Sequence, residues 1–267
     1  MPCSNSGVQR AASMSSMRKS SRPPCAFFAS PALSKAERAC PRCSAPFGLG
    51  ARHELVDSHE LERPGYQRND SDRCFYCKSE LYRISAKKRL EWDVAHVVNG
   101  TNTDDLGDYR PGLEAASQAG ARSPLVEAGL SKADVRVLAK HIGLGVWDKP
   151  ASACLSSRLP YGTRVTRERL DQIGTLEASL HGMGLRQLRV RWHALPATEG
   201  TKEGSLARIE IDRSEFERAF ALAHEMAEAG RAAGFMHITL DLQGYRKGSH
   251  NEALDPTAQG SKGRRLP

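Results

Sequence analysis

The spacing of apolar residues changes near residue 185, and this change limits which folds the chain can adopt. Upstream, apolar side chains recur at the three- and four-residue intervals of amphipathic helices. Downstream, residues 188–192 and 206–211 alternate apolar and polar side chains, which is typical of strands with one solvated face. A helix over 216–233, with Phe220 on its apolar side, and a strand over 236–242 follow. We therefore predict an α/β protein whose C-terminal end is a smaller β-β-α-β unit.

The upstream half combines helices with short apolar runs. A helical pattern extends from Asp72 to Leu90, and a second helix begins at Ser131 with Leu138 on its inward face. The run 92–99 is almost continuously apolar and ends in a polar loop, which predicts a buried strand of a parallel sheet. Ligands gather at the carboxyl ends of such strands. Two further elements are expected, a strand over 53–57 and a helix over 166–182.

Positive charge is concentrated at the two ends of the chain. The formal net charge is +8, but residues 1–39 hold six basic residues against one acid, and residues 255–267 hold three against one. A domain that follows a phosphate backbone would carry its excess on a folded face, so the pattern argues against a nucleic-acid partner. No apolar stretch approaches the roughly 18 residues of a membrane span, and we expect no membrane partner.

The cysteine content indicates a reducing compartment. Seven cysteines in 267 residues are too few for a disulfide scaffold, and an odd number leaves at least one outside any disulfide. We therefore expect a cytoplasmic protein. Residues 1–36 contain no Asp or Glu and are rich in Ser, Arg and Ala, so an organellar transit segment is the alternative.

Two Cys-x-x-Cys pairs are either a zinc site or ordinary buried thiols. Cys40 and Cys43 form the first pair, and Cys74 and Cys77 form the second. Four thiolates suit tetrahedral zinc, but thirty residues separate the pairs and the second pair lies on a predicted helix.

Cys154 is a candidate nucleophile because of its cationic surroundings. It lies in a small-residue loop between Lys149 and Arg158, and nearby cations favour the thiolate form. The alternative is a partly buried loop cysteine beside an unrelated arginine. Arg189 and Arg191 share one face of a predicted strand, where they form either a phosphate clamp or part of a solvated face.

Six blocks of sequence point together to one family. They are Asp72-Arg-Cys-Phe-Tyr-Cys-Lys78; Gly100-Thr-Asn-Thr-Asp-Asp105 with Asp108-Tyr-Arg-Pro-Gly112; Lys149-Pro-Ala-Ser-Ala-Cys-Leu-Ser-Ser-Arg158; Arg189-Val-Arg191; Ala207-Arg-Ile-Glu210; and Asp241-Leu-Gln-Gly-Tyr-Arg246. In this order, over about residues 28–254, the chain resembles the LarE family. These are ATP-dependent sacrificial sulfur transferases of the PP-loop (adenine nucleotide alpha-hydrolase) superfamily.

The resemblance implies a Rossmann-like parallel sheet and a defined reaction. ATP would activate a carboxylate of pyridinium-3,5-biscarboxylic acid mononucleotide, and sulfur would convert it to a thiocarboxylate, on the route to the nickel-pincer cofactor of lactate racemase. ATP and Mg²⁺ are the implied cofactors, and a small pyridinium mononucleotide is the implied substrate. We also expect a homo-oligomer.

The resemblance also assigns roles by matching position. Cys154 would be the sulfur donor and would end as dehydroalanine. Some family members hold an iron–sulfur cluster with additional cysteines, but only Cys154 lies in this loop, which favours the sacrificial type. The other implied positions are Arg158, Arg189 and Arg191 for the substrate phosphate or AMP, Glu177 and Glu210 for proton transfer or metal-assisted orientation, and Gly100, Thr101, Asn102 and Asp105 for the nucleotide cleft. An exposed helix acid and a strand acid are the alternatives for the two glutamates.

The N-terminal part departs from the family pattern. A Ser-Gly-Gly-Val-Asp-Ser loop that cradles the ATP pyrophosphate is expected upstream of residue 28, where only residues 4–8 are distantly similar. We therefore expect weak ATP binding. The expected parts are a disordered basic tail (1–26), a partial PP-loop nucleotide-binding domain (27–165), a C-terminal α+β substrate and catalytic domain (166–254) and a disordered tail (255–267).

Two other functions stay open. One is a PP-loop relative that thiolates tRNA, and the other is a non-catalytic zinc-knuckle module built on the two Cys-x-x-Cys pairs.

Overall fold

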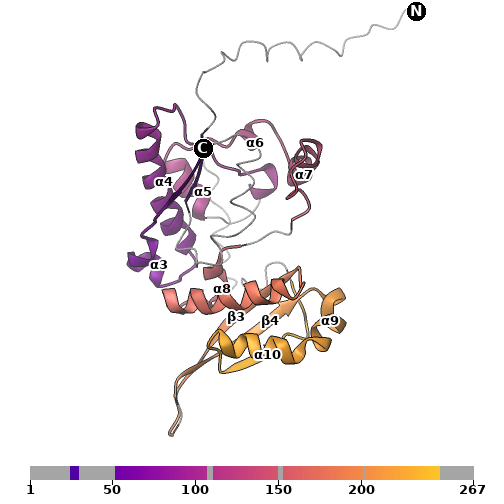
Figure 1. Ribbon diagram of the computed structural model, residues 1–267. Helices are drawn as coiled ribbons and strands as arrows, with labels where there is room; N and C mark the ends of the chain where they lie inside the picture. Colours follow the sequence, from indigo (N-terminus) through magenta and orange to yellow (C-terminus); the bar gives the residue numbers. More distant parts are fainter. Residues whose placement is uncertain (1–24, 30–51, 107–110, 150–152, 201, 247–267) are drawn as a thin grey trace, which may run out of the picture.

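The computed structural model describes residues 25–29, 52–106, 111–149, 153–200 and 202–246 (Figure 1). Helices and strands are mixed in these residues, which confirms an α/β protein. The PP-loop sheet, the two tails and a zinc site that uses Cys40 and Cys43 involve residues outside the described ranges, so they stay predictions. In the described ranges, no helix combines the length and the apolarity needed to cross a bilayer.

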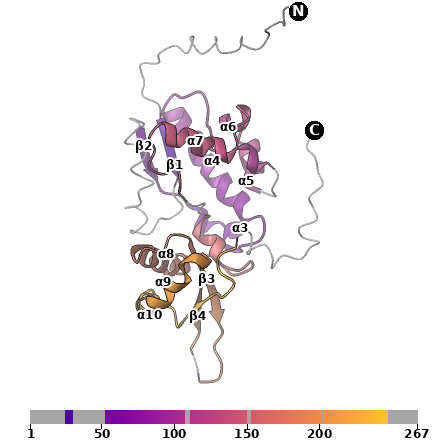
Figure 2. The same cartoon turned by 90° about the vertical axis from the view of Figure 1, so that its right-hand side faces the viewer.

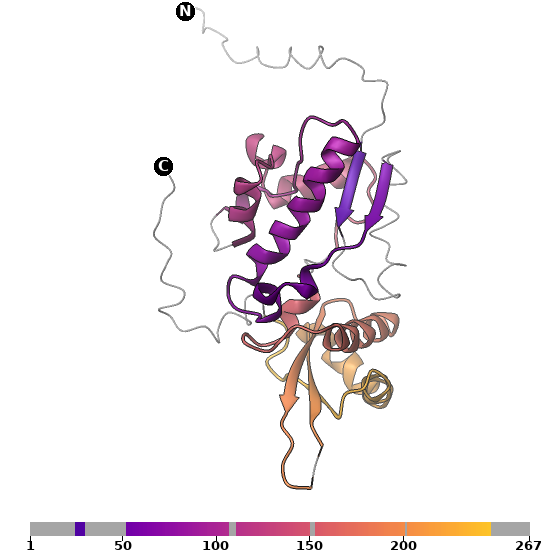
Figure 3. The same cartoon turned by 90° about the vertical axis from the view of Figure 1, so that its left-hand side faces the viewer.

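We call the described residues from 25 to 149 the N-terminal region. Its elements are β1 (Cys25–Ala29), β2 (Arg52–Val56), η2 (Glu60–Glu62), α3 (Pro64–Gln67), α4 (Arg73–Glu91), η3 (Thr103–Asp105), α5 (Pro111–Gln118), α6 (Pro124–Glu127) and α7 (Lys132–His141). β1 begins two residues before the expected start of the domain at residue 27. The two strands pair in parallel, which confirms the short strand predicted near residue 53. The long helix α4 lies against α5 and β1 (Figure 3).

The run 92–99 does not form the predicted buried strand. The backbone turns at Asp93, whose φ is +51°, and Val98 makes only an isolated parallel bridge to Arg122. Val98 is exposed. A buried parallel strand needs neighbours on both edges, and this run has one bridge within the described residues.

Helix α7 begins as predicted but does not bury the predicted face. Ser131 and Asp134 form a capping box, and Gly143 follows the helix with φ +75°. Leu138, however, is 47% exposed, so its predicted inward orientation is wrong. An apolar stripe shows which side of a helix is apolar, but it does not show whether another element covers that side.

We call residues 153–246 the C-terminal unit. Its elements are η4 (Leu155–Arg158), α8 (Arg167–Gly182), β3 (Leu188–Leu195), β4 (Gly204–Ile211), η5 (Arg213–Glu215), α9 (Phe216–Ala221), α10 (Ala223–Ala232) and β5 (His237–Leu240). The sheet order is β3-β4-β5, with β3 and β4 antiparallel and β4 and β5 parallel. This topology confirms the β-β-α-β unit. The β3–β4 hairpin extends away from α3 and α4 (Figure 2).

The predicted single helix over 216–233 is two helices. The backbone leaves helical geometry at Leu222, where φ is −101° and ψ is 16°. Phe220 is 61% exposed, whereas Met226 on α10 is buried. The break allows α10 to pack against α8 and β5, and this tertiary packing overrides the continuous helical pattern.

The main core lies between α8 and the sheet. Leu170, Ile173, Leu176 and Leu180 recur at helical spacing on α8 and are buried against alternate residues of β3 and β4. The opposite face of these strands carries the polar side chains. It is not solvated as predicted, because Arg191 is 3% exposed and Glu210 is 1% exposed.

Candidate active site

Cys154 caps the short helix η4, as expected for a loop that leads into a turn. Its φ and ψ are −68° and 154°, and its carbonyl accepts from the backbone N–H of Ser157 at 3.0 Å and from the Ser157 hydroxyl at 2.7 Å. The residue is exposed to solvent. This turn, residues 154–158, which we call the Cys154 turn, therefore presents a cysteine on a backbone that local hydrogen bonds hold.

The N-terminal region holds this turn through buried polar groups of α3, of α4 and of the segment between them. Arg73 donates from Nη1 to the Ser156 carbonyl at 2.9 Å and also donates to the side chain of Asn69. Asn69 has φ +61° and donates to the Pro160 carbonyl at 2.7 Å. Tyr66 and Ser156 share a hydroxyl–hydroxyl bond of 2.8 Å. None of these four side chains was expected to take part, although Arg73 and Ser156 lie in blocks that resemble the LarE family.

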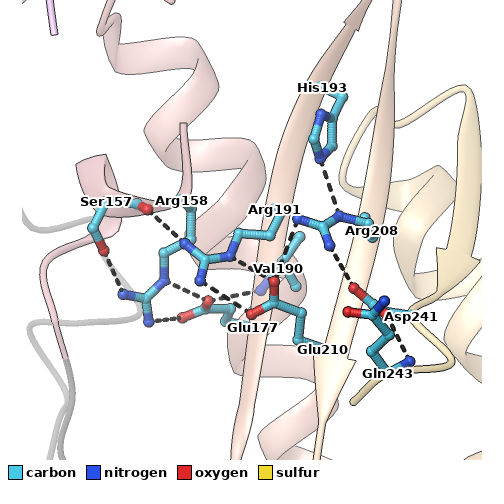
Figure 4. Close-up of polar contacts among 10 residues, drawn as sticks. All are labelled: Ser157, Arg158, Glu177, Val190, Arg191, His193, Arg208, Glu210, Asp241 and Gln243. Carbon is cyan, nitrogen blue, oxygen red and sulfur yellow. Dashed lines mark hydrogen bonds and ion pairs between the residues drawn. The ribbon is translucent and has the colours of Figure 1, made fainter. Parts of the chain in front are cut away.

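The C-terminal unit holds the same turn through a buried ion pair. Arg158 donates from Nε and Nη2 to the two carboxylate oxygens of Glu177, at 2.8 and 3.1 Å (Figure 4). Its Nη1 donates to the carbonyls of Ala153 and Cys154, at 2.9 and 3.1 Å. Glu177 also accepts from the backbone N–H of Val190 on β3 at 3.0 Å. Glu177 is therefore a buried acceptor, not the exposed helix acid considered as its alternative.

A second buried pair lies beside the first. Arg191 donates from Nε and Nη2 to Glu210, at 3.0 and 3.1 Å, and from Nη1 to the Ser157 carbonyl at 2.8 Å. Arg208 lies opposite Arg191 in the sheet register and approaches the same carboxylate at 3.4 Å. Arg208 also pairs with Asp241 and donates to His193 Nε2 at 3.3 Å (Figure 4). Like charges that face each other across two strands repel, and Glu210 offsets this repulsion.

Arg189 differs from its two neighbours. Its guanidinium lies over the ring of Tyr245, 4.8 Å from the centroid, and no ion pair to it is found among the residues that the structure describes. Burial lowers the pKa of Arg189, and the cations Arg158 and Arg191 lower it further. The sequence pattern grouped Arg189 and Arg191 on one strand face, as either a phosphate clamp or part of a solvated face. Of these two, Arg189 is half-buried with a guanidinium that is not matched to a described carboxylate, whereas Arg191 is paired with Glu210.

The surroundings of Cys154 favour its thiolate. Desolvation raises the pKa of this thiol, but Arg73, the Ser156 hydroxyl, the Ser157 N–H and Arg158 together outweigh it, so the pKa lies below the ordinary value of 9.0. The hydroxyl of Ser156 lies 3.5 Å from the sulfur. The sequence suggested this effect through Arg158, but the larger cationic contribution comes from Arg73, 81 positions earlier in the chain.

The second Cys-x-x-Cys pair lies on the first turns of α4, near enough to Cys154 to interact electrostatically. Burial, followed by the nearby Cys154, raises the pKa of Cys74, and the same causes raise that of Cys77 to about 12. Both therefore stay neutral thiols at neutral pH. Within the described ranges, no group of three His, Cys, Asp or Glu side chains is arranged to hold a metal ion.

The predicted nucleotide residues form a local turn. Asn102 and Asp105 make a capping box at η3, and the Thr101 N–H donates to the Asn99 side chain at 3.0 Å. Gly100 has open space where a Cβ would lie. These hydrogen bonds lie within the turn, and its assignment to a nucleotide cleft stays a prediction.

Comparison with known proteins identifies relatives over most of the chain. An uncharacterised protein of Synechocystis is 40% identical over 208 residues, which are 77% of this chain and 74% of that protein. The pyridinium-3,5-bisthiocarboxylic acid mononucleotide synthase of Lactiplantibacillus plantarum is 35% identical over 206 residues, which are 77% of this chain and 71% of the synthase. No protein-family model matches the chain. With this identity to the synthase sustained over most of both proteins, the chain belongs to the LarE family.

Proposed function

We propose that this protein transfers sulfur from Cys154 to an ATP-activated carboxylate of a pyridinium mononucleotide. The observation that carries the proposal is the Cys154 turn, on which an exposed cysteine with a thiol of lowered pKa is held in place by the buried arginines Arg73 and Arg158. The name of the Lactiplantibacillus plantarum relative supports a mononucleotide substrate rather than tRNA. We also propose a cytoplasmic homo-oligomer.

The chemistry explains why both ATP and a thiolate are needed. A carboxylate resists nucleophiles because it is already anionic and has no good leaving group. Adenylation by ATP releases pyrophosphate and makes AMP the leaving group. The Cys154 thiolate then attacks the acyl carbon and expels AMP, which forms a thioester. Loss of the Cys154 Cα proton with cleavage of its Cβ–S bond leaves a thiocarboxylate on the product and dehydroalanine in the protein.

The buried arginines take different parts in this proposal. Arg189 would bind the substrate phosphate, because among Arg158, Arg189 and Arg191 it is the one without a described carboxylate partner, and the Tyr245 ring orients its guanidinium. Arg158 and Arg191 would position the Cys154 turn, since Glu177 and Glu210 engage their guanidinium groups. We therefore propose orientation of arginines, rather than proton transfer, for the two glutamates.

Magnesium is the metal ion expected from the family. The residues present offer no cluster of three ligands within the described ranges. Mg²⁺ commonly binds through substrate phosphates with few protein ligands.

Intact-protein mass spectrometry after incubation with ATP, Mg²⁺ and the pyridinium biscarboxylate mononucleotide tests the proposal. We expect a loss of about 34 Da, the mass of hydrogen sulfide, in the wild type and not in Cys154→Ala. Cys74→Ser is the matched control, because it removes a neighbouring thiol and should keep the mass loss. Formation of thiocarboxylate by a protein of unchanged mass would refute the sacrificial step.

A further inference from the structure

The hydroxyls of Tyr66 and Ser156 and the thiol of Cys154 form a hydrogen-bond chain at the Cys154 turn. Tyr66 Oη lies 2.8 Å from Ser156 Oγ, and Ser156 Oγ lies 3.5 Å from Cys154 Sγ. Tyr66 and Ser156 are both buried, and they are 90 positions apart in the sequence. The Ser156 hydroxyl helps to lower the pKa of Cys154, but the reaction steps above assign no role to the Tyr66 hydroxyl or to the contact between the two hydroxyls.

We infer that Ser156, held by Tyr66, is a positioning residue that donates a hydrogen bond to the Cys154 thiolate and holds the sulfur ready for attack. The inference rests on Cys154 being the reacting thiol of the proposed function. It adds two residues that act through the sulfur and do not contact the substrate.

The direction of donation along this hydrogen-bond chain follows from the number of protons on each group. A serine hydroxyl has one proton, so when Ser156 donates to the sulfur, its oxygen must accept from Tyr66. Burial of Tyr66 raises the pKa of its phenol, so Tyr66 stays protonated and acts as the donor. A neutral Cys154 thiol is only a weak hydrogen-bond donor, so it does little to favour the opposite direction, from the sulfur through Ser156 to Tyr66. Ionisation of Cys154 therefore selects the direction from Tyr66 through Ser156 to the sulfur.

The backbone at Ser156 is held independently of this chain. Its carbonyl accepts from Arg73 Nη1 at 2.9 Å, and Arg73 is itself tied to Asn69. The serine donor is therefore in place before the substrate arrives. Donors that are already oriented need no rearrangement when the charge develops on the group that they face.

Other titratable groups near the Cys154 sulfur also influence its ionisation, in addition to Ser156. Arg73 and Arg158 favour the thiolate through their charges, while Cys74 and Cys77 have raised pKa values and stay neutral. A substitution at Ser156 therefore removes its hydrogen bond to the sulfur and leaves the charges of Arg73 and Arg158 in place.

The rate of Cys154 alkylation by iodoacetamide as a function of pH tests this inference without ATP or substrate. Alkylation is followed on the tryptic peptide 141–158, in which Cys154 is the only cysteine. In Ser156→Ala, we expect the apparent pKa of Cys154 to rise by about one unit and the rate below that pKa to fall about tenfold, as for a lost hydrogen bond to a charged group. Ser156→Thr keeps a hydroxyl and should restore the wild-type profile.

Two further variants keep the inference falsifiable if Ser156→Ala does not fold. Tyr66→Phe keeps the packed ring and removes the outer donor, so it should shift the profile in the same direction by a smaller amount. Ser157→Ala is the matched control, because its hydroxyl bonds the Cys154 carbonyl and not the sulfur. A wild-type profile for both Ser156→Ala and Tyr66→Phe, or an equal shift for Ser157→Ala, overturns the inference. Shifted alkylation with no sulfur transfer by the wild type refutes the proposed function alone.

Discussion

The two regions of the protein bury their apolar side chains to different extents. In the C-terminal unit, α8 and the three-stranded sheet enclose a continuous core that includes Ile173, Leu176 and Ile209. In the N-terminal region, the separate described cluster is built on Tyr82, Ala115 and Ala116. The Cys154 turn belongs to the C-terminal unit and also accepts a hydrogen bond from Arg73 of the N-terminal region. The two ion-paired arginines that hold it, Arg158 and Arg191, bond to carboxylates of the C-terminal unit. This difference suggests that the C-terminal unit supplies the rigid support of the site.

The largest expected effect comes from breaking a buried ion pair in the C-terminal unit. Glu210→Ala leaves Arg191 buried without its carboxylate, and we expect a loss of about 3–5 kcal/mol in the free energy of unfolding. Urea denaturation followed by circular dichroism measures it. Glu228→Ala is the control, because Glu228 pairs with Arg231 at the surface of the same unit and should change stability by about 0–1 kcal/mol. Equal losses in the two variants would contradict the proposed rigid support.

A cavity in the core of the C-terminal unit has the next largest effect. Leu176 is 0% exposed, so Leu176→Ala removes buried methyl groups and leaves a void between α8 and the sheet. We expect a loss of about 3 kcal/mol in the free energy of unfolding. In native-state hydrogen exchange, the increase in rate caused by Leu176→Ala should be larger for the amides of β3 and β4 than for those of α4. A uniform increase over both regions would mean that they unfold as one unit.

Acid should weaken the N-terminal region through Glu80. Hydrogen bonds from Arg83, and then the charges of Arg63 and Arg83, lower the pKa of this buried carboxyl from 4.5 to about 2. The carboxylate therefore stabilises the fold above pH 4.5, and this contribution is lost as the pH falls from 4.5 to about 2. The stability difference between the wild type and Glu80→Gln should narrow over this interval. A stability difference that stays constant from pH 7 to pH 2 would show that the ion pairs of Glu80 with Arg63 and Arg83 do not contribute to stability.

The smallest expected effect comes from an apolar side chain of α7. Leu138→Ala is chemically the same substitution as Leu176→Ala, but Leu138 is half exposed. We expect a change within about 0.5 kcal/mol in the free energy of unfolding. A loss comparable to that of Leu176→Ala would show that this face is covered in solution, and it would remove the contrast between the two regions.

Local sequence signals predicted many of the elements but not how they pack. The Ser131 capping box and the N-cap at Thr166 begin helices where expected, because these hydrogen bonds involve residues within one turn. The predictions of a buried strand over 92–99 and of a single helix over 216–233 were wrong, because both forms depended on contacts with residues far away in the sequence. The same limit applies to Phe220, which lies on an apolar stripe and is nevertheless exposed.

The sequence by itself determined Cys154 as the candidate nucleophile and the two-residue periodicity that places Arg189 and Arg191 on one strand face. Only the tertiary structure decided that Arg191 pairs with Glu210, 19 positions away, and that Arg73 and Tyr66 reach the turn after Cys154. The physical reason is that burying an ionised side chain is costly without a partner. Which arginines are matched by carboxylates therefore depends on the folded arrangement, and periodicity alone does not report it.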